Sequence, residues 1–215
     1  AVSNLNVDTR SANGSQWIDE FDGLSALDLK AGAGNVTLTT GGAVLDGDVA
    51  VDVRATTLTG QINGAFGSGA SADGAIDTDV VHLNVNTAAA GGSQWIDERN
   101  GLSTLNLIAG AGNVTLAAGG TVLDGDAARD IQATTFTGVI NGGFGAGATA
   151  NDAIDTAVAN LNVDTRNADG GQWIDEVDGL ATLNLNAGTG AITLTTGGAV
   201  LDGDALLDIQ ATTFT

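Results

Sequence analysis

The sequence predicts an all-β fold, a parallel β-helix solenoid, on three observations. The run Gln16–Glu20 (QWIDE) recurs at Gln94–Glu98 and again at Gln172–Glu176, each time 78 residues later, so the chain is a tandem array. Within each copy, apolar residues alternate with Thr, Asn and Asp in short runs, and this period of two is typical of strands. The 33 glycines punctuate these runs. Short strands in a repeating unit favour stacked coils.

The array divides into copies at 4–81, 82–159 and 160–215, with the third copy partial, and we expect one solenoid over residues 1–215. Strand-like runs begin at Leu5, Leu27 and Val51, and the first such run of the next copy begins at Leu83. These starts give coils of 22, 24 and 32 residues. Three coils per 78-residue repeat is therefore the expected architecture. With coils ~4.8 Å apart, one copy would advance about 14 Å along the axis.

The alternation also predicts which side chains face inward. The expected core positions of the first two copies are Leu5, Val7, Leu27, Leu29, Val36, Leu38, Val53 and Leu58, then Leu83, Val85, Leu105, Leu107, Val114, Leu116, Ile131 and Phe136. The third coil carries extra Gly-rich length at 60–75 and 138–153. Such stretches have few side chains to pack, so we expect protruding loops anchored by Phe66 and Phe144.

Runs such as Leu183–Gly188 (LNLNAG) and Ile192–Gly198 (ITLTTGG) resemble those of filamentous-haemagglutinin-type bacterial surface proteins. The likeness extends over the whole chain. It implies a right-handed parallel β-helix, exported as a long array and serving as an adhesin or fibre. The sequence departs from that group's repeat of roughly 20 residues, because the unit here is three coils long.

Composition restricts the partners. Lys and Arg total 6 against 26 Asp and Glu, a formal charge of −20 that repels nucleic acid and anionic lipid surfaces. Cations are the expected companions. The chain has no Cys, so it has no disulfide framework or thiolate metal site, and no apolar run reaches the ~18 residues of a membrane span. These features favour an extracellular, bacterial cell-surface or secreted location.

A Gly turn with nearby carboxylates is the best candidate binding site. Carboxylates two and six residues apart could supply several oxygens to a calcium ion. The alternative is that these side chains form solvated Asx-turns that cap strand ends. The candidate metal ligands are Asp46, Asp48 and Asp52, then Asp124, Asp126 and Asp130, and finally Asp202, Asp204 and Asp208.

The tryptophans Trp17, Trp95 and Trp173 recur once per copy, so we expect them to form one row along the solenoid. Such a row could be an aromatic face that binds surface glycans. A tryptophan beside a Gly turn more often caps a corner of the core.

We expect no enzyme activity, no catalytic residue and no cofactor besides calcium. The adjacent acids of each QWIDE run point to opposite faces of a strand, so they make poor catalytic pairs. The expected function is mechanical: a stiff acidic rod that serves as an extracellular fibre, matrix component or adhesin stalk. It would associate with itself end to end or form part of a longer array. The alternative is a calcium- or glycan-binding adhesive module.

Overall fold

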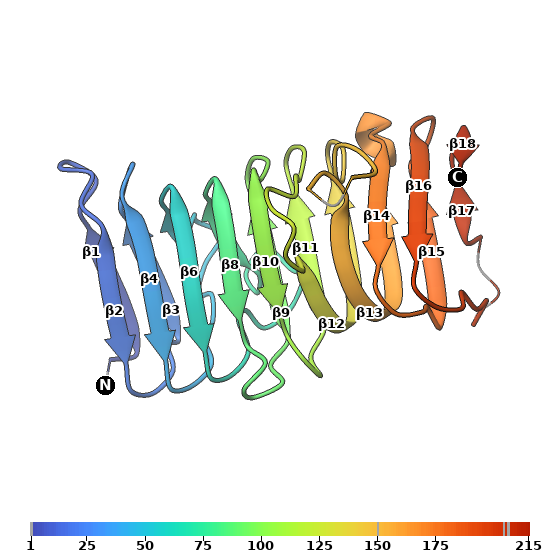
Figure 1. The fold of residues 1–215 in the computed structure, drawn as a ribbon. Helices are drawn as coiled ribbons and strands as arrows, with labels where there is room; N and C mark the ends of the chain where they lie inside the picture. The colour runs from blue at the N-terminus through green and yellow to red at the C-terminus, as the bar shows by residue number, and fades with distance from the viewer. Residues whose placement is uncertain (1, 150, 204, 206) are drawn as a thin grey trace.

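The computed structural model of the chain is a parallel β-solenoid of about nine turns (Figure 1). The structure describes residues 2–149, 151–203, 205 and 207–215. Within these residues there is no α-helix, and the single helical segment is a short 3-10 turn, Arg166–Ala168. No helix of the described chain is long and apolar enough to cross a membrane. The predicted all-β solenoid is therefore confirmed.

The turns are built from short strands. In the first copy they are β1 (Asn4–Asp8), β2 (Gln16–Glu20), β3 (Ala26–Lys30), β4 (Asn35–Thr40), β5 (Val53–Arg54), β6 (Thr57–Ile62) and β7 (Ile76–Asp79). The second has β8 (His82–Asn86), β9 (Gln94–Glu98), β10 (Thr104–Ile108), β11 (Val114–Ala118), β12 (Ile131–Ile140) and β13 (Ile154–Asp164), which runs into the third. The third continues with β14 (Gln172–Glu176), β15 (Thr182–Asn186), β16 (Ala191–Thr196), β17 (Ile209–Gln210) and β18 (Thr213–Phe214).

The strands form two parallel stacks. The first stack contains β1, β3, β5, β7, β9, β11, the C-terminal halves of β12 and β13, β15 and β17. The second contains β2, β4, β6, β8, β10, the N-terminal halves of β12 and β13, β14, β16 and β18. Every pairing is parallel, so backbone hydrogen bonds run along the axis from turn to turn.

Equivalent strands of successive copies lie in different stacks, an arrangement that we call the exchange of stacks. Val7 pairs with Leu29, the next turn brings Val53 and the third brings Thr78, all in the first stack. Val85 is the counterpart of Val7 in the second copy, but it pairs with Gly60 in the second stack. A copy therefore covers three turns and about half of another, not the three coils predicted, and this corresponds to a rise of about 17 Å instead of about 14 Å at the usual strand spacing. Sequence-equivalent strands of neighbouring copies lie on opposite sides of the rod.

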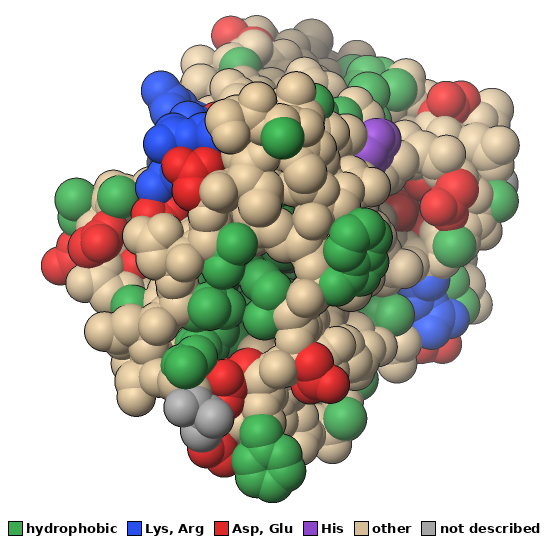
Figure 2. All heavy atoms as spheres, turned by 90° about the vertical axis from the view of Figure 1, so that its left-hand side faces the viewer, with side chains coloured by type: hydrophobic (Ala, Val, Ile, Leu, Met, Phe, Trp, Pro, Cys, Tyr) green, Lys and Arg blue, Asp and Glu red, His purple; other side chains and the backbone are tan. Residues whose placement is uncertain are grey.

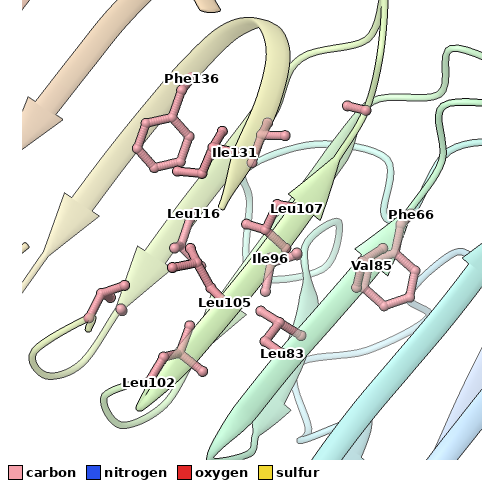
Figure 3. Packing of buried hydrophobic residues seen from close by; sticks show 14 of the residues in the cluster. Phe66, Leu83, Val85, Ile96, Leu102, Leu105, Leu107, Leu116, Ile131 and Phe136 are labelled. Carbon is pink, nitrogen blue, oxygen red and sulfur yellow. The ribbon is translucent and has the colours of Figure 1, made fainter. Parts of the chain in front are cut away.

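The interior is a continuous apolar column. Of the sixteen predicted core positions, fourteen are buried, and Leu5 and Val7 of the first turn are partly buried against the same cluster. Figure 3 shows Leu83, Leu105 and Leu107 entering this interior from neighbouring strands. Seen from the N-terminal end, apolar side chains occupy the middle of the end surface (Figure 2). The period-two pattern thus predicts the core correctly.

The parts of the Gly-rich segments that protrude from the solenoid are shorter than predicted. β6 continues through Ile62, and Phe66 is fully buried and forms a parallel bridge to Gln94. The excursion from the solenoid is therefore 67–75, closed by bonds from Ser68 and Gly69 to the Gly74 carbonyl. In the second copy Phe144 is also buried, and it stacks on Phe136 with ring centroids 5.6 Å apart. Both phenylalanines anchor the segments as expected.

Candidate cation-binding site

Aspartates from successive turns stand next to one another on the first stack. Leu29 pairs with Val53, which brings Asp28 beside Asp52. The Asp52 N–H donates to the Asp77 carbonyl, and the Asp77 N–H donates to Asp52 Oδ2 at 2.8 Å. Asp77 pairs in register with Asp97. We call Asp52, Asp77 and Asp97 the carboxylate ladder. Like charges directly opposite each other on neighbouring strands are destabilising, so this arrangement favours the protonated form of its members.

The Gly turn predicted as a calcium site lies beside this ladder. Asp46 is only 7 % exposed, and its Oδ1 accepts a hydrogen bond from the Asp48 N–H at 2.8 Å. Its Oδ2 is buried and has no hydrogen-bond partner. Asp48 Oδ1 in turn accepts from the Ala50 N–H at 2.7 Å. The predicted Asx-turns are present, but they leave one buried carboxylate oxygen without a partner, and such an atom is costly.

The charged residues of the turn raise the pKa of two residues of the ladder. Burial raises the pKa of Asp52 to about 8, and the nearby charges of Asp46, Asp77 and Asp48 raise it further. Burial also raises the pKa of Asp77 to about 6, with contributions from Asp97, Asp46 and Asp48. The Asp46 charge therefore contributes to the raised pKa of both residues. The site is a concentration of negative charge with limited access to water.

The second copy repeats the arrangement on the opposite side of the rod. Asp124 is 6 % exposed, its Oδ1 accepts from the Asp126 N–H at 2.8 Å, and its Oδ2 is buried without a partner. Asp130 Oδ2 accepts from the Asp155 N–H at 2.8 Å, and Asp155 pairs in register with Asp175. Burial raises the pKa of Asp130 to about 8. The geometry is thus reproduced in two separate places.

The third predicted group is only partly placed. Asp202 is exposed and lies outside the strands, and Asp208 lies before β17, where its carbonyl accepts from the Leu185 N–H. Asp204 lies outside the described residues. The 215 residues contain no third counterpart of Asp77.

The sequence did not identify two residues of the carboxylate ladder, Asp77 and Asp97, as candidate site residues. Asp77 and Asp97 lie 31 and 51 residues after Asp46, and only strand pairing brings them beside the turn. The sequence does contain one indication of their importance, because both aspartates recur 78 residues later as Asp155 and Asp175.

The acids are not gathered into a ready metal centre. Among the described residues, no three His, Cys, Asp or Glu side chains are close enough to hold a metal ion together. Arg99 lines a pocket with Asp77 and Asp97. Burial and the charges of neighbouring aspartates raise the pKa of Asp155, and the charge of Arg129 opposes part of this rise. Each ladder is therefore accompanied by one guanidinium, which offsets only part of its negative charge.

The tryptophans do not form a single row. Trp17 and Trp173 belong to the second stack, whereas Trp95 belongs to the first. Trp95 and Trp173 are half-buried, and their backbone N–H groups donate to the backbone carbonyls of Phe66 and Phe144, at the base of the Gly-rich excursions. Trp17 is 78 % exposed. The two inner tryptophans thus cap corners, and the expected continuous aromatic face is not formed.

The acids of the QWIDE runs separate as predicted. Asp97 is exposed, whereas Glu98 is fully buried and accepts bonds from Thr78 Oγ1 at 2.8 Å and from the Val80 N–H at 3.1 Å. Burial raises the pKa of Glu98 to about 7. Glu176 is buried in the same way. These glutamates fasten one turn to the next, a role that the sequence analysis missed.

The chain matches no protein-family model, and comparisons with curated proteins and with solved structures gave no match.

Proposed function

We propose that the protein is a non-enzymatic mechanical element of the bacterial exterior, a stiff acidic rod that serves as a fibre, matrix component or adhesin stalk. The observation that carries the proposal is the continuous parallel pairing of both stacks through every turn. A load along the axis acts on many backbone hydrogen bonds at once in each turn. Buried Glu98 and Glu176 add bonds between turns.

The repeat makes length adjustable. Each turn contacts only the turns above and below, so a further copy adds rise without a new core. The first turn presents partly buried Leu5, Val7 and Ile18 at its end, and these side chains suit stacking against another turn. That turn belongs either to the same long chain or to a second subunit. We propose a right-handed coil sense, as the resemblance to the haemagglutinin-type proteins implies.

Insertion of one additional copy of residues 82–159 after residue 159 tests the rod. Small-angle scattering of the two proteins should show a particle longer by about 17 Å with an unchanged cross-section. A thicker or more compact particle would refute an extended rod. The mass of the native material separates the two assembly modes, because a mass near 21 kDa supports short stacked subunits and a far larger one supports a single long chain.

Antibodies against the chain test its location. Labelling of intact source cells, or of the material shed around them, supports an external rod. Labelling that appears only after the cells are permeabilised contradicts it.

The second candidate is an adhesive module that binds cations or glycans. The two buried turns with unpartnered carboxylate oxygens favour cations. The separation of the tryptophans onto opposite stacks gives no corresponding support for glycans.

A further inference from the structure

We propose that the protein binds a neutral, hydroxyl-rich linear polymer, a polysaccharide, in two troughs that run along opposite sides of the rod. The first trough lies on β6, β8 and β10, and the second lies on β12, β13 and β15. The inference rests on the second candidate function, adhesion to glycans, and names the surface that performs it. The rod needs no such ligand, so the mechanical proposal and this one can fail separately.

Each trough is bounded by two rows of side chains that cross three successive turns. The rows of the first trough are Thr59, Asn84 and Asn106, and Gln61, Asn86 and Ile108. The rows of the second are Thr137, Asn162 and Asn184, and Val139, Asp164 and Asn186. Because neighbouring strands are about 4.8 Å apart, a polymer lying along a trough meets a new pair of side chains at each such step. The volumes are only about 120 and 310 Å³, which suits a chain lying along the surface.

The absence of charge distinguishes the first trough from most of the chain. The strands β4, β6, β8 and β10 follow one another along the rod (Figure 1) and contain no Asp, Glu, Lys or Arg. A metal cation or a basic partner therefore finds no carboxylate in this trough. The net charge of −20 repels polyanions and also a second copy of the rod. A neutral ligand avoids both restrictions.

The second trough is also nearly neutral. It contains Asp164 and Arg166, but these two side chains form an ion pair with a distance of 3.1 Å between Arg166 Nε and Asp164 Oδ2. The pair adds no net charge to the trough. Both troughs therefore select for the same class of ligand.

The side-chain amides supply donors and acceptors for hydroxyl groups. Among the residues that the structure describes, no hydrogen bond engages the side chains of Asn84, Asn162 or Asn184. Asn106 Oδ1 is buried and has no partner. An amide offers two donors and one acceptor oxygen, and a hydroxyl group both donates and accepts. A polymer with several hydroxyl groups per unit can therefore satisfy these amides at each turn.

A tryptophan belongs to one row of each trough. Trp17 pairs with Thr37, and Thr37 pairs with Thr59, so Trp17 lies two turns, about 10 Å, from the first trough. Trp95 has the same relation to the second trough. Trp17 is 78 % exposed, and an exposed indole ring is an apolar platform with a polar N–H. The apolar face of a sugar ring can pack on it, and this contact needs no continuous row of tryptophans.

Surface plasmon resonance of the 215-residue chain tests the inference, with immobilised glucomannan, hydroxyethyl cellulose and dextran as neutral probes and alginate as an anionic control. At least one neutral polysaccharide should bind the chain, and alginate should not. The binding should be nearly the same at low and at high NaCl, because salt screens only interactions between charges. Absence of binding to all three neutral probes, or binding that weakens steeply with NaCl, would overturn the proposal.

Matched variants locate the ligand. Asn84→Asp with Asn162→Asp places one carboxylate in each trough at unchanged size and should weaken binding by about tenfold or more, because each removes amide donors from the ligand. Ala72→Asp with Ala127→Asp adds the same charge at exposed positions outside both troughs, so this control should bind as the original chain does. Circular dichroism checks that both variants fold. Full affinity in a folded trough variant would refute the assignment.

A second variant and a mass measurement complete the test. Gln61→Glu with Val139→Glu changes exposed side chains at the edges of the troughs, so it should fold even if the first variant does not, and it should also weaken binding. Light scattering of the free chain should give a mass near 21 kDa. A doubled mass at high NaCl that is lost in either trough variant would mean that a second rod covers these faces, and the proposal would be wrong.

Discussion

Truncation of Leu107 to Ala tests whether the rod is held by its apolar column. Leu107 is fully buried in β10, between Val85 of the preceding turn and Ile131 of the next. Figure 3 shows its side chain in the same interior as Ile96 and Leu116. Both neighbouring turns are fixed by parallel backbone bonds, so the cavity cannot collapse easily. The loss should lie in the upper part of the usual range for such truncations, about 3–5 kcal/mol.

Urea unfolding followed by circular dichroism and by tryptophan fluorescence measures this loss. Leu201→Ala is the matched control, because Leu201 is 58 % exposed. That substitution should change the free energy of unfolding by less than about 0.5 kcal/mol. Hydrogen exchange should increase first in β8, β10 and β12, the strands that pair through Leu107. A cost below about 1 kcal/mol, or a loss equal to that of the control, would show that the column is not the main source of stability.

Three further predictions concern close packing, buried acids and pH. Gly119→Ala should lower the melting temperature strongly, because a Cβ there would lie 2.1 Å from the Arg99 carbonyl oxygen. The control Gly69→Ala places its Cβ in open space and should leave the melting temperature nearly unchanged. Glu176→Gln should cost about 1–3 kcal/mol in urea unfolding, since it weakens the bond from Thr156 Oγ1 at 2.6 Å inside the fold. Without divalent cations, the free energy of unfolding should decrease as pH rises from about 4 to 8, because the folded chain keeps protons on Asp52 and Asp130 that the unfolded chain has already released. Urea titrations across that range would contradict this if stability increased instead.

The sequence predicted the fold because its evidence is local and repeated. Alternation at Leu27, Leu29, Val36 and Leu38 assigns the inward face without knowledge of which strands pair. The exchange of stacks could not be predicted in this way. It depends on how many residues each corner uses, and only the pairing of Val85 with Gly60 reveals it.

The candidate site was predicted in part for the same reason. Asp46, Asp48 and Asp52 are close in sequence, so their spacing alone pointed to a turn rich in oxygen ligands. Asp77 and Asp97 belong to later turns, and their proximity is a consequence of register. The burial of Asp46 was also hidden from the sequence, since a Gly-Asp turn ordinarily lies in solvent. The expected tryptophan row is wrong because residues that are equivalent in sequence lie on different stacks, as Trp17 and Trp95 do.

The exchange of stacks also controls the straightness of a long array. Each Gly-rich excursion adds residues to one side of the rod. Extra residues on the same side in every copy would curve the axis steadily in one direction. Here the first excursion leads into Ile76 of the first stack, and its counterpart in the second copy leads into Ile154 of the second stack. Any bend that one excursion caused would be opposed by the excursion of the next copy. In a longer array of this kind, a pair of copies, 156 residues, would be the smallest unit with excursions on both sides.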